Sequence, residues 1–508
     1  MFSKIVKGKK TLAVSVAAGL IFSVVSLEVP AQAAPGVLTV GASQGIPQLN
    51  PILRTFTFEE TLFPLLWSGL TTWLPDGSIG PDLATEWHTN TAANLWTFRL
   101  APGAKFSDGT PLNAKAVKDS FDYARLPSTV TQEANKISMI ESISASANKV
   151  IFKLNKPNAM FPAAVAWIKI IKATQVSKFN VNPSTSGPYM VKSFTPNVSL
   201  DMVRNPNYFG AAAKVSEIKI VVAADPTAAV TSLRSGDINV LYQVPLSSAA
   251  SLKSDSALKL IQPAVPTTAV TWEYDLNSAP FNDIRVRQAI AYATDRNAIL
   301  QAAYYGFGKV SSLNTIVPDN SLWQCGTAGG LTKYTYDLQK SKSLFAAAGV
   351  TSFDWWGVSG ALPEFDAMGQ VLQASLKTIG ITMNIKNNPI GTWVAAFYPA
   401  GKTYPGLLVP NYQSVPGEPA FSMNFLLSGR AESNWNNTTY DGLYSKAVGT
   451  PSNSARKAVF CSAMKLENQQ LPLITPLVFD VVHATSSNIS GVWEEGGGQL
   501  HLEDAQIG

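Results

Sequence analysis

Hydrophobic residues recur along the chain at two spacings, and each spacing predicts one kind of element. Alternating apolar and polar positions predict strands over Leu95–Leu100 and Ile381–Ile385. Apolar residues three and four positions apart predict helices over 113–124, 284–304, 337–348 and 365–379. Gly349 and Gly380 directly follow the last two, as glycines that end helices do. Helices and strands therefore alternate, which predicts an α/β fold.

The length of the chain and the absence of linkers bear on its domain organisation. At roughly 150 residues per domain, the 508 residues suggest two to four domains. No internal repeat and no low-complexity linker divides the sequence. We therefore expect domains that are joined by several crossings of the chain.

The composition argues against a nucleic-acid partner. Charged residues make up 14% of the chain, below the usual share of about 25%. The formal net charge of +5 owes much to Lys4, Lys7, Lys9 and Lys10 at the N-terminus. Because binding to nucleic acid depends on clustered lysine and arginine, we expect no such partner.

Residues 1–33 have the pattern of an export signal. A lysine-rich start is followed by an uncharged apolar run over Thr11–Leu27 and by a small-x-small site at Ala31–Ala33. We expect cleavage before Ala34 and a mature protein in the periplasm, at the cell surface or secreted. An uncleaved membrane anchor is the alternative, because the run approaches the ~17 residues of a spanning helix. No cysteine follows the run, so we expect no lipoprotein anchor.

Cys325 and Cys461 are the two cysteines of the chain. Export permits a disulfide and an even count suits one, so we expect these residues to pair. Two separate buried thiols are the alternative.

A Gly-x-Ser-x-Gly pattern over Gly41–Gly45 is typical of serine hydrolases, where it places the nucleophile on a sharp turn before a helix. Here Pro47 and Pro51 follow the serine and break regular structure. A triad also needs a histidine base, and of three histidines His483 alone lies in a suitable extended run. We expect Ser43 to end a strand in a polar loop; a secreted serine hydrolase that uses Ser43 is the alternative function.

Other chemistry finds no support in the motifs. The histidines and cysteines are too scattered for a metal site, and no phosphate-binding or dinucleotide-binding glycine motif is present. We therefore expect no catalytic residues, no cofactor and no metal.

Several motifs in one order resemble those of a known family. In chain order they read "LNP" (49–51), "PDLATEWHTNTAANLWTFRL" (81–100), "KFSDGTP" (105–111), "SGPYMVKSF" (186–194), "RNPNYFG" (204–210) and "NSAPFNDIRVRQA" (277–289). Together, over about 37–482, they resemble the family 5 extracellular solute-binding proteins of ABC importers, which includes oligopeptide, dipeptide and nickel binders.

The resemblance implies a two-lobed, type II periplasmic-binding-protein fold with an extra subdomain inserted in lobe I. It implies lobe I over 34–68, 174–269 and 476–508, the insert over 69–173 and lobe II over 270–475. It also implies that ligand is trapped as the lobes close, and that a membrane permease and ATPase receive it. We expect a monomer that captures a peptide or a similar polar solute and catalyses no reaction.

The resemblance also implies which residues contact ligand. In lobe I these are Gln44, Arg54, Thr57, Phe58 and Glu59. At the hinge crossing and in lobe II they are Trp272, Tyr274, Trp355, Trp393, Asn411 and Tyr412. For each aromatic residue, packing within its own lobe is the alternative.

One departure from the family pattern concerns the ligand. Peptide-binding members carry a Trp-x-x-Asp-Tyr-like segment whose aspartate pairs with the amino terminus of the peptide. Here Asn411 stands near that position, and a neutral amide cannot neutralise a buried ammonium group. Glu59, Glu273 or Glu418 could substitute, whereas a sugar, an N-blocked peptide or a metal chelate would need none of them.

A third possible function is that of a relative that senses a ligand or acts like a chaperone and delivers no cargo.

Overall fold

The computed structural model describes residues 36–508, apart from 55–56, 130, 132, 224, 265–267, 360–362, 398–405, 415–416, 431–432 and 496. The expected export signal over 1–33 lies outside the described residues. Within them, no helix is long and apolar enough to cross a membrane.

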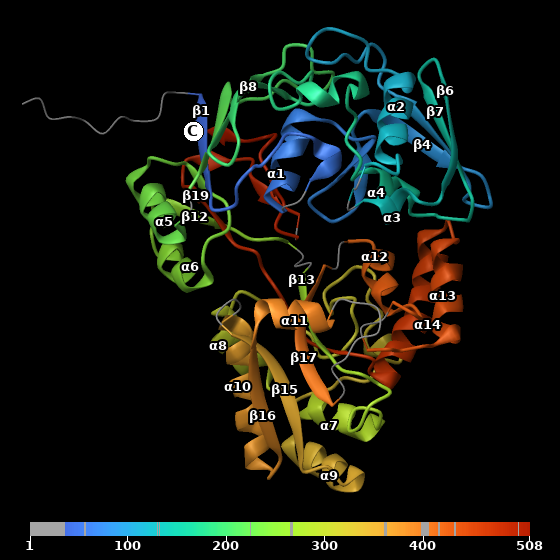
Figure 1. The fold of residues 1–508 in the computed structure, drawn as a ribbon, viewed down its shortest axis with the longest axis vertical. Helices are drawn as coiled ribbons and strands as arrows, with labels where there is room; N and C mark the ends of the chain where they lie inside the picture. Colours follow the sequence, from blue (N-terminus) through green and yellow to red (C-terminus); the bar gives the residue numbers. More distant parts are fainter. Residues whose placement is uncertain are drawn as a thin grey trace, which may run out of the picture.

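A seven-stranded sheet lies in the left part of the upper lobe in Figure 1. Its central strand β1 (Val37–Ala42) pairs in parallel with β10 (Glu217–Val222) and β11 (Val240–Leu241). Leu38 and Val40 are fully buried, so one face of β1 lies in the core. The other strands are β8 (Tyr189–Thr195), β9 (Ser199–Arg204), β12 (Leu258–Ile261) and β19 (His483–Ser486), and the accompanying helices are α1 (Thr57–Leu66), α5 (Pro226–Ser235) and α6 (Leu246–Lys253).

A second sheet of four strands belongs to the same lobe. Its order is β4 (Ala84–Thr89), β5 (Leu95–Leu100), β7 (Lys149–Leu154) and β6 (Ile140–Ser146), and α2 (Ala114–Ala124) contacts β6 and β7. The predicted strand over Leu95–Leu100 is confirmed, with Trp96 and Phe98 buried. Asn113 caps α2 by accepting hydrogen bonds from two backbone amides, as its residue type favours. Short elements nearby are β2 (Thr71–Trp73), β3 (Ile79–Pro81), α3 (Ala134–Ile137) and α4 (Phe161–Val165).

The lower lobe is built on a six-stranded sheet. Its order is β14 (Gly308–Val310), β18 (Ile474–Phe479), β13 (Thr268–Glu273), β17 (Leu407–Ser414), β15 (Ser352–Ser359) and β16 (Thr382–Pro389). The helices of this lobe are α7 (Ile284–Ala293), α8 (Arg296–Tyr304), α9 (Leu338–Ala348), α10 (Pro363–Thr378), α11 (Ile390–Phe397), α12 (Pro419–Met423), α13 (Thr438–Val448) and α14 (Asn453–Gln470). The glycines at 349 and 380 end α9 and α10 in the left-handed conformation, which confirms their predicted role.

One predicted helix is two helices in the structure. The prediction over 284–304 was wrong at Thr294, which is extended, and Asp295, which caps α8 by accepting a hydrogen bond from the Ala298 amide. The sequence there contains no glycine or proline, so local pattern alone favours one continuous helix.

The chain passes between the two large sheets twice, from β12 to β13 and from β18 to β19. Two of the boundaries expected from the resemblance, after Ala269 and after Thr475, fall inside β13 and β18, and both strands belong to the lower sheet. The assignment of every residue to a lobe remains a prediction.

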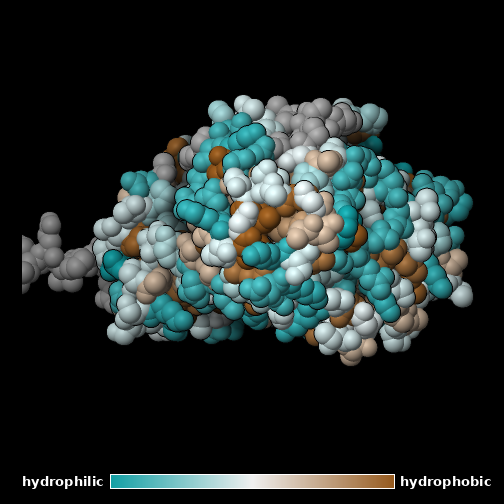
Figure 2. Space-filling model, turned by 90° about the horizontal axis from the view of Figure 1, so that it is seen from below, coloured by the Kyte–Doolittle hydropathy of each residue, from teal (hydrophilic) through white to brown (hydrophobic). Residues whose placement is uncertain are grey.

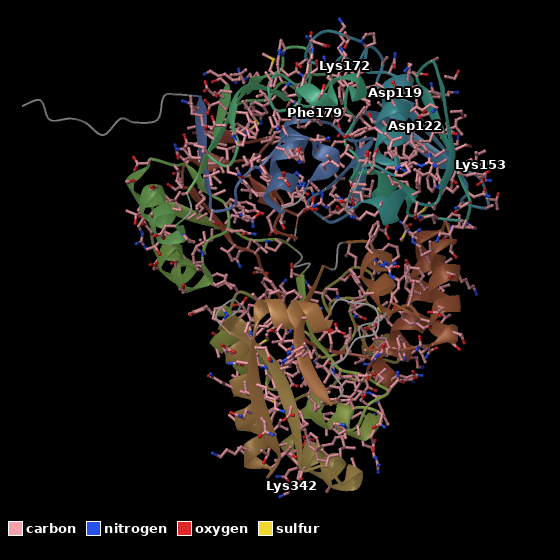
Figure 3. The ribbon with its side chains drawn as sticks, in the orientation of Figure 1. Asp119, Asp122, Lys153, Lys172, Phe179 and Lys342 are labelled. Atoms are coloured by element: carbon pink, nitrogen blue, oxygen red, sulfur yellow. A yellow bond between two sulfur atoms is a disulfide. The ribbon has the colours of Figure 1, made fainter. Side chains whose placement is uncertain are left out.

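Exposed ion pairs lie on the outer surfaces. Asp119 and Asp122 on α2 pair with Lys115 and Lys118, and Lys342 marks the opposite end of the molecule (Figure 3). Seen from below, the end of the lower lobe is largely hydrophilic, with hydrophobic residues in small patches (Figure 2).

Candidate ligand-binding site

A cavity of about 1390 Å³ lies between the upper and the lower lobe. Ligand pockets for small molecules commonly measure about 300–1,000 Å³, so this space is large. Its upper wall includes Arg54, Thr57, Glu60, Trp73, Trp87, Trp96, Lys136, Lys156, Trp167 and Glu495. Its lower wall includes Leu322, Trp323, Tyr412, Glu418, Phe421, Phe425, Arg430, Tyr444, Arg456 and Lys457.

Aromatic rings line both walls. In the upper wall, the rings of Trp73 and Trp167 meet edge to face, with centroids 6.3 Å apart. In the lower wall, Trp323 packs edge-on against Phe460 of α14. Rigid, largely apolar rings suit a cavity that excludes water once a ligand is bound.

Arg54 lies at the centre of an ionic cluster in the upper wall. Its guanidinium pairs with Glu60, at 2.5 Å, and with Glu133. Lys136 also pairs with Glu133, and its ammonium lies 4.1 Å from the centroid of the Trp167 ring. Arg54 lies over the same ring at 5.5 Å. Two cations thus fix one tryptophan ring at the cavity wall.

Burial and pairing act against each other in this cluster. Burial raises the pKa of Glu60 to about 7, although Arg54 attracts its charge. Burial by itself would lower the pKa of Arg54, but Glu60 and Glu133 raise that pKa above its ordinary value. We infer that Arg54 stays charged and that its charge is neutralised by the protein.

The lower wall holds a second buried ion pair. Arg456 Nη2 lies 3.2 Å from Glu418 Oε1, and the Arg456 guanidinium lies over Trp323 at 5.0 Å. Burial raises the pKa of Glu418, although Arg456 opposes the shift. Glu418 Oε2 is buried and has no hydrogen-bond partner among the described residues. The described residues therefore leave this buried acceptor without a donor.

Tyr412 connects the cavity to the interior of the lower lobe. Its hydroxyl donates to Glu364 Oε1 at 2.6 Å and lies 3.2 Å from the Tyr304 hydroxyl. The neighbouring Asn411 is 4% exposed, and its Oδ1 accepts a hydrogen bond from the Tyr412 amide. The side-chain oxygen of Asn411 is therefore already hydrogen-bonded to the backbone of β17.

Only some of the residues that the resemblance assigns to ligand contact line the cavity. Arg54, Thr57 and Tyr412 line the cavity. Gln44 lies outside this lining and hydrogen-bonds Gln243 and the Phe58 amide. The rest are buried and outside the lining, namely Phe58, Glu59, Trp272, Tyr274, Trp355, Trp393 and Asn411.

Packing explains the position of the buried aromatic residues. Trp272 and Trp355 meet edge to face at 5.3 Å in the core of the lower lobe. Tyr274 stacks on Phe281, and its hydroxyl donates to the Leu471 carbonyl. In this structure these three residues pack inside the lower lobe.

Most of the lining was missed by sequence reasoning. Trp73, Trp167 and Lys136 belong to the segment expected as an insert, and Trp323 and Arg456 to the lower lobe. A cluster of tryptophans near basic residues is the one signal that could have found them. The neighbouring sequence does not distinguish a tryptophan that lines the cavity from one that is buried in a core.

The lobes touch beside the cavity. The amide of Ala159 in the upper lobe donates to the Val448 carbonyl in the lower lobe at 2.7 Å. Gly417 lies so close to Gly77 that a Cβ at position 417 would be 2.5 Å from the Gly77 carbonyl oxygen. All four residues also belong to the cavity lining, so the lobes are in contact where they line this space.

The structure joins Cys325 to Cys461 by a disulfide, with Cα atoms 5.7 Å apart. Ser43 follows β1 in an irregular loop and makes no hydrogen bond to a histidine within the described part of the chain. His483 instead accepts a hydrogen bond from the Gln243 amide. Among the described residues, no group of three or more His, Cys, Asp or Glu is arranged to hold a metal ion.

Two α/β lobes around a cavity lined from both sides define a class, the two-lobed binding proteins. The model of the bacterial extracellular solute-binding proteins, family 5 Middle, matches residues 78–434, and the chain belongs to this family. It is a solute-binding protein and not an enzyme, so the hydrolase interpretation of Ser43 was wrong. The missing helix after Ser43 is the physical reason.

Relatives and solved structures agree with this assignment. The chain is 24% identical to the dipeptide-binding protein of Escherichia coli K12, covering 92% of this chain and 94% of the relative. It is 25% identical to heme-binding protein A of Haemophilus influenzae, covering 78% of each chain. The structure of HbpA2 from Haemophilus parasuis has a TM-score of 0.82 at 19% identity, covering 93% of this chain and all of that one.

A dipeptide-binding protein from Pseudoalteromonas sp. SM9913, solved in complex with Met-Leu, has a TM-score of 0.74 at 20% identity. The match covers 93% of this chain and 100% of that structure. These structures confirm the two-lobed fold that the resemblance implied.

Proposed function

We propose that this protein captures a small peptide or a similar polar solute in the cavity between its lobes and delivers it to an ABC importer. The observation that carries the proposal is the cavity itself, which is lined by aromatic and charged side chains from both lobes. Ligand contacts made by both lobes favour a closed state, which a membrane permease can distinguish from the open one. Relatives named as ABC transporter peptide-binding proteins support this role.

The charges of the site favour a particular kind of peptide end group. Glu59 and Glu273 are buried outside the cavity lining, whereas Glu418 lines the cavity. Of the three carboxylates that could replace the missing aspartate, Glu418 is thus the one placed to meet a ligand. Since Arg456 already neutralises Glu418, a neutral hydrogen-bond donor suits this position better than a second cation.

The test is a thermal and calorimetric screen of the mature protein. The probes are Met-Leu, N-acetyl-Met-Leu, a disaccharide and a nickel–histidine complex. A probe at 100 times its dissociation constant should raise the free energy of unfolding by about 2.7 kcal/mol. Failure of every probe, together with no solute in native mass spectra of the protein as purified, would contradict the proposal.

A matched pair of variants locates the site. Trp167→Ala removes the ring that Arg54 and Lys136 both contact and should weaken binding of the best probe. Tyr305→Ala removes a ring that is 53% exposed and outside the cavity lining, and it should leave binding unchanged. Equal affinities of the two variants would show that Trp167 is not part of the ligand-binding site.

We also propose export through the leader, cleavage before Ala34 and a monomeric mature protein. Intact-mass measurement of the exported protein tests the cleavage, and sedimentation velocity tests the oligomeric state. The description of the family as extracellular solute-binding proteins supports export.

A further inference from the structure

The segment 318–331 crosses the lower wall of the cavity without a long regular element. Ser321, Leu322 and Trp323 line the cavity, and a single 3₁₀ turn covers Thr327–Gly329. Several of its backbone hydrogen bonds are short-range, such as Ser321 to Pro318 and Gln324 to Ser321. The segment therefore needs other contacts to keep a fixed position.

One side of α14 supplies these contacts. The Arg456 guanidinium lies 5.0 Å from the Trp323 centroid, and the Phe460 ring meets Trp323 at 5.9 Å with planes perpendicular. Lys457 Nζ donates to the Leu322 carbonyl. Cys461 forms the disulfide to Cys325, two residues after the tryptophan. Positions 456 and 460 form one row of side chains along α14, and positions 457 and 461 form the neighbouring row, so two adjacent rows of the helix contact the segment.

The disulfide is the one covalent link between the segment 318–331 and this side of α14. It joins residues 136 positions apart, and both cysteines are only partly buried. The other contacts between the segment and this side of α14 are one cation–π contact, one ring contact and one hydrogen bond, each worth about 1 kcal/mol. Without the disulfide, the position of Trp323 would depend on these contacts and on local hydrogen bonds. The Trp323 amide donates to Ser321 Oγ, and Gln324 Nε2 donates to Thr315 Oγ1 and the Val317 carbonyl.

We propose that the Cys325–Cys461 disulfide sets ligand affinity by holding Trp323 at the cavity wall, where the ring packs against an apolar or aromatic group of the bound solute. This inference rests on the proposed function for its ligand, but the positioning of Trp323 does not. Trp323 is the residue that contacts solute, and the two cysteines are positioning residues.

The chain offers a clean chemical test, because these are its only two cysteines. Dithiothreitol supplies two electrons and two protons, which converts the disulfide to two thiols while the reagent becomes its cyclic disulfide. Hydrogen exchange is compared between the oxidised and the reduced protein without ligand. We expect faster exchange over 318–331 and unchanged exchange in the upper sheet. Unchanged exchange over 318–331 would overturn the positioning claim.

The second measurement is the affinity, by calorimetry, for whichever of Met-Leu, N-acetyl-Met-Leu, the disaccharide and the nickel–histidine complex the oxidised protein binds most tightly. Reduction and the double variant Cys325→Ala/Cys461→Ala should each weaken binding about threefold to tenfold, and Trp323→Ala about tenfold. Dithiothreitol should not change the affinity of the double variant, and Tyr305→Ala should bind as the original chain does. If the double variant does not fold, reversible reduction and reoxidation of the unaltered chain replaces it.

The outcomes separate the two proposals. If the oxidised protein binds no probe, the proposed function fails, while hydrogen exchange still decides whether the disulfide positions Trp323. If the oxidised protein binds one of the four probes and both reduction and Trp323→Ala leave that affinity unchanged, the inference fails and the proposed function stands.

Discussion

Buried charges at single positions show how this chain balances burial against pairing. Arg54 and Arg456 are largely buried at the cavity walls, and each has a carboxylate partner. Burying an unpaired charge costs several kcal/mol of folding free energy. The carboxylate partners therefore allow Arg54 and Arg456 to be buried at the cavity walls. The cavity therefore presents ordered cations whose charges are already neutralised.

His501 should give the chain a pH dependence whose sign follows from its two carboxylate neighbours. It is 4% exposed, with Nε2 at 3.0 Å from Glu495 and Nδ1 at 3.3 Å from Glu503. Burial by itself would lower the pKa of His501, but Glu503 and Glu495 raise it to about 9. A raised pKa stabilises the fold fully below the ordinary value of about 6.5, and this stabilisation is lost as the pH rises through about 9.

We therefore expect the free energy of unfolding to fall between pH 6.5 and 9, by at most about 1.4 kcal/mol per pH unit from this group. His501→Gln should flatten that fall, and His88→Gln, at an exposed position, should not. Urea unfolding at a series of pH values measures both. An unchanged slope in His501→Gln would show that other groups cause the dependence.

At the scale of elements, the break between α7 and α8 shows tertiary contacts overruling a helical pattern. Arg296 is 5% exposed, and its guanidinium donates to the carbonyls of Ser311 and Tyr334 and to Asn314 Oδ1. These acceptors lie on other segments and hold the chain where the helix breaks. Asp295 then begins the new helix as its cap.

Removing this cap has a predictable cost. Asp295→Ala should lower the free energy of unfolding by about 1 kcal/mol, because the Ala298 amide loses its acceptor. Asp119→Ala on α2 removes a carboxylate from an exposed pair and should change stability by less than about 0.5 kcal/mol. Urea unfolding compares the two variants, and equal effects would argue against the cap.

At the scale of the whole molecule, the contact between the lobes depends on a residue without a side chain. A Cβ at position 417 would come within 2.5 Å of the Gly77 carbonyl oxygen, a backbone atom that cannot rotate away. Ala159 and Val448 make the neighbouring contact between the lobes. Glycine at 417 therefore lets the lobes approach as closely as they do.

Gly417→Ala should keep the lobes further apart and weaken ligand binding, with little change in the stability of either lobe. Small-angle X-ray scattering should show a larger radius of gyration, and calorimetry a lower affinity for the best probe. Gly442→Ala adds the same methyl group where nothing lies within 4 Å, and it should change neither quantity. A compact Gly417→Ala protein with full affinity would contradict this role.

The sequence by itself determined the α/β character, several strands and helix ends, and the family. These follow from alternation, capping residues and local motifs, which act within a few residues. The cap at Asn113 and the glycines after α9 and α10 are examples.

Only the tertiary structure decided which side chains face the cavity. Trp272, Trp355, Trp167 and Trp323 have the same side chain. Nevertheless, Trp272 and Trp355 lie in the core of the lower lobe, whereas Trp167 and Trp323 line the cavity between the lobes. The difference depends on which surfaces the two lobes turn toward each other. That arrangement is set by contacts between segments hundreds of residues apart, which no local pattern encodes.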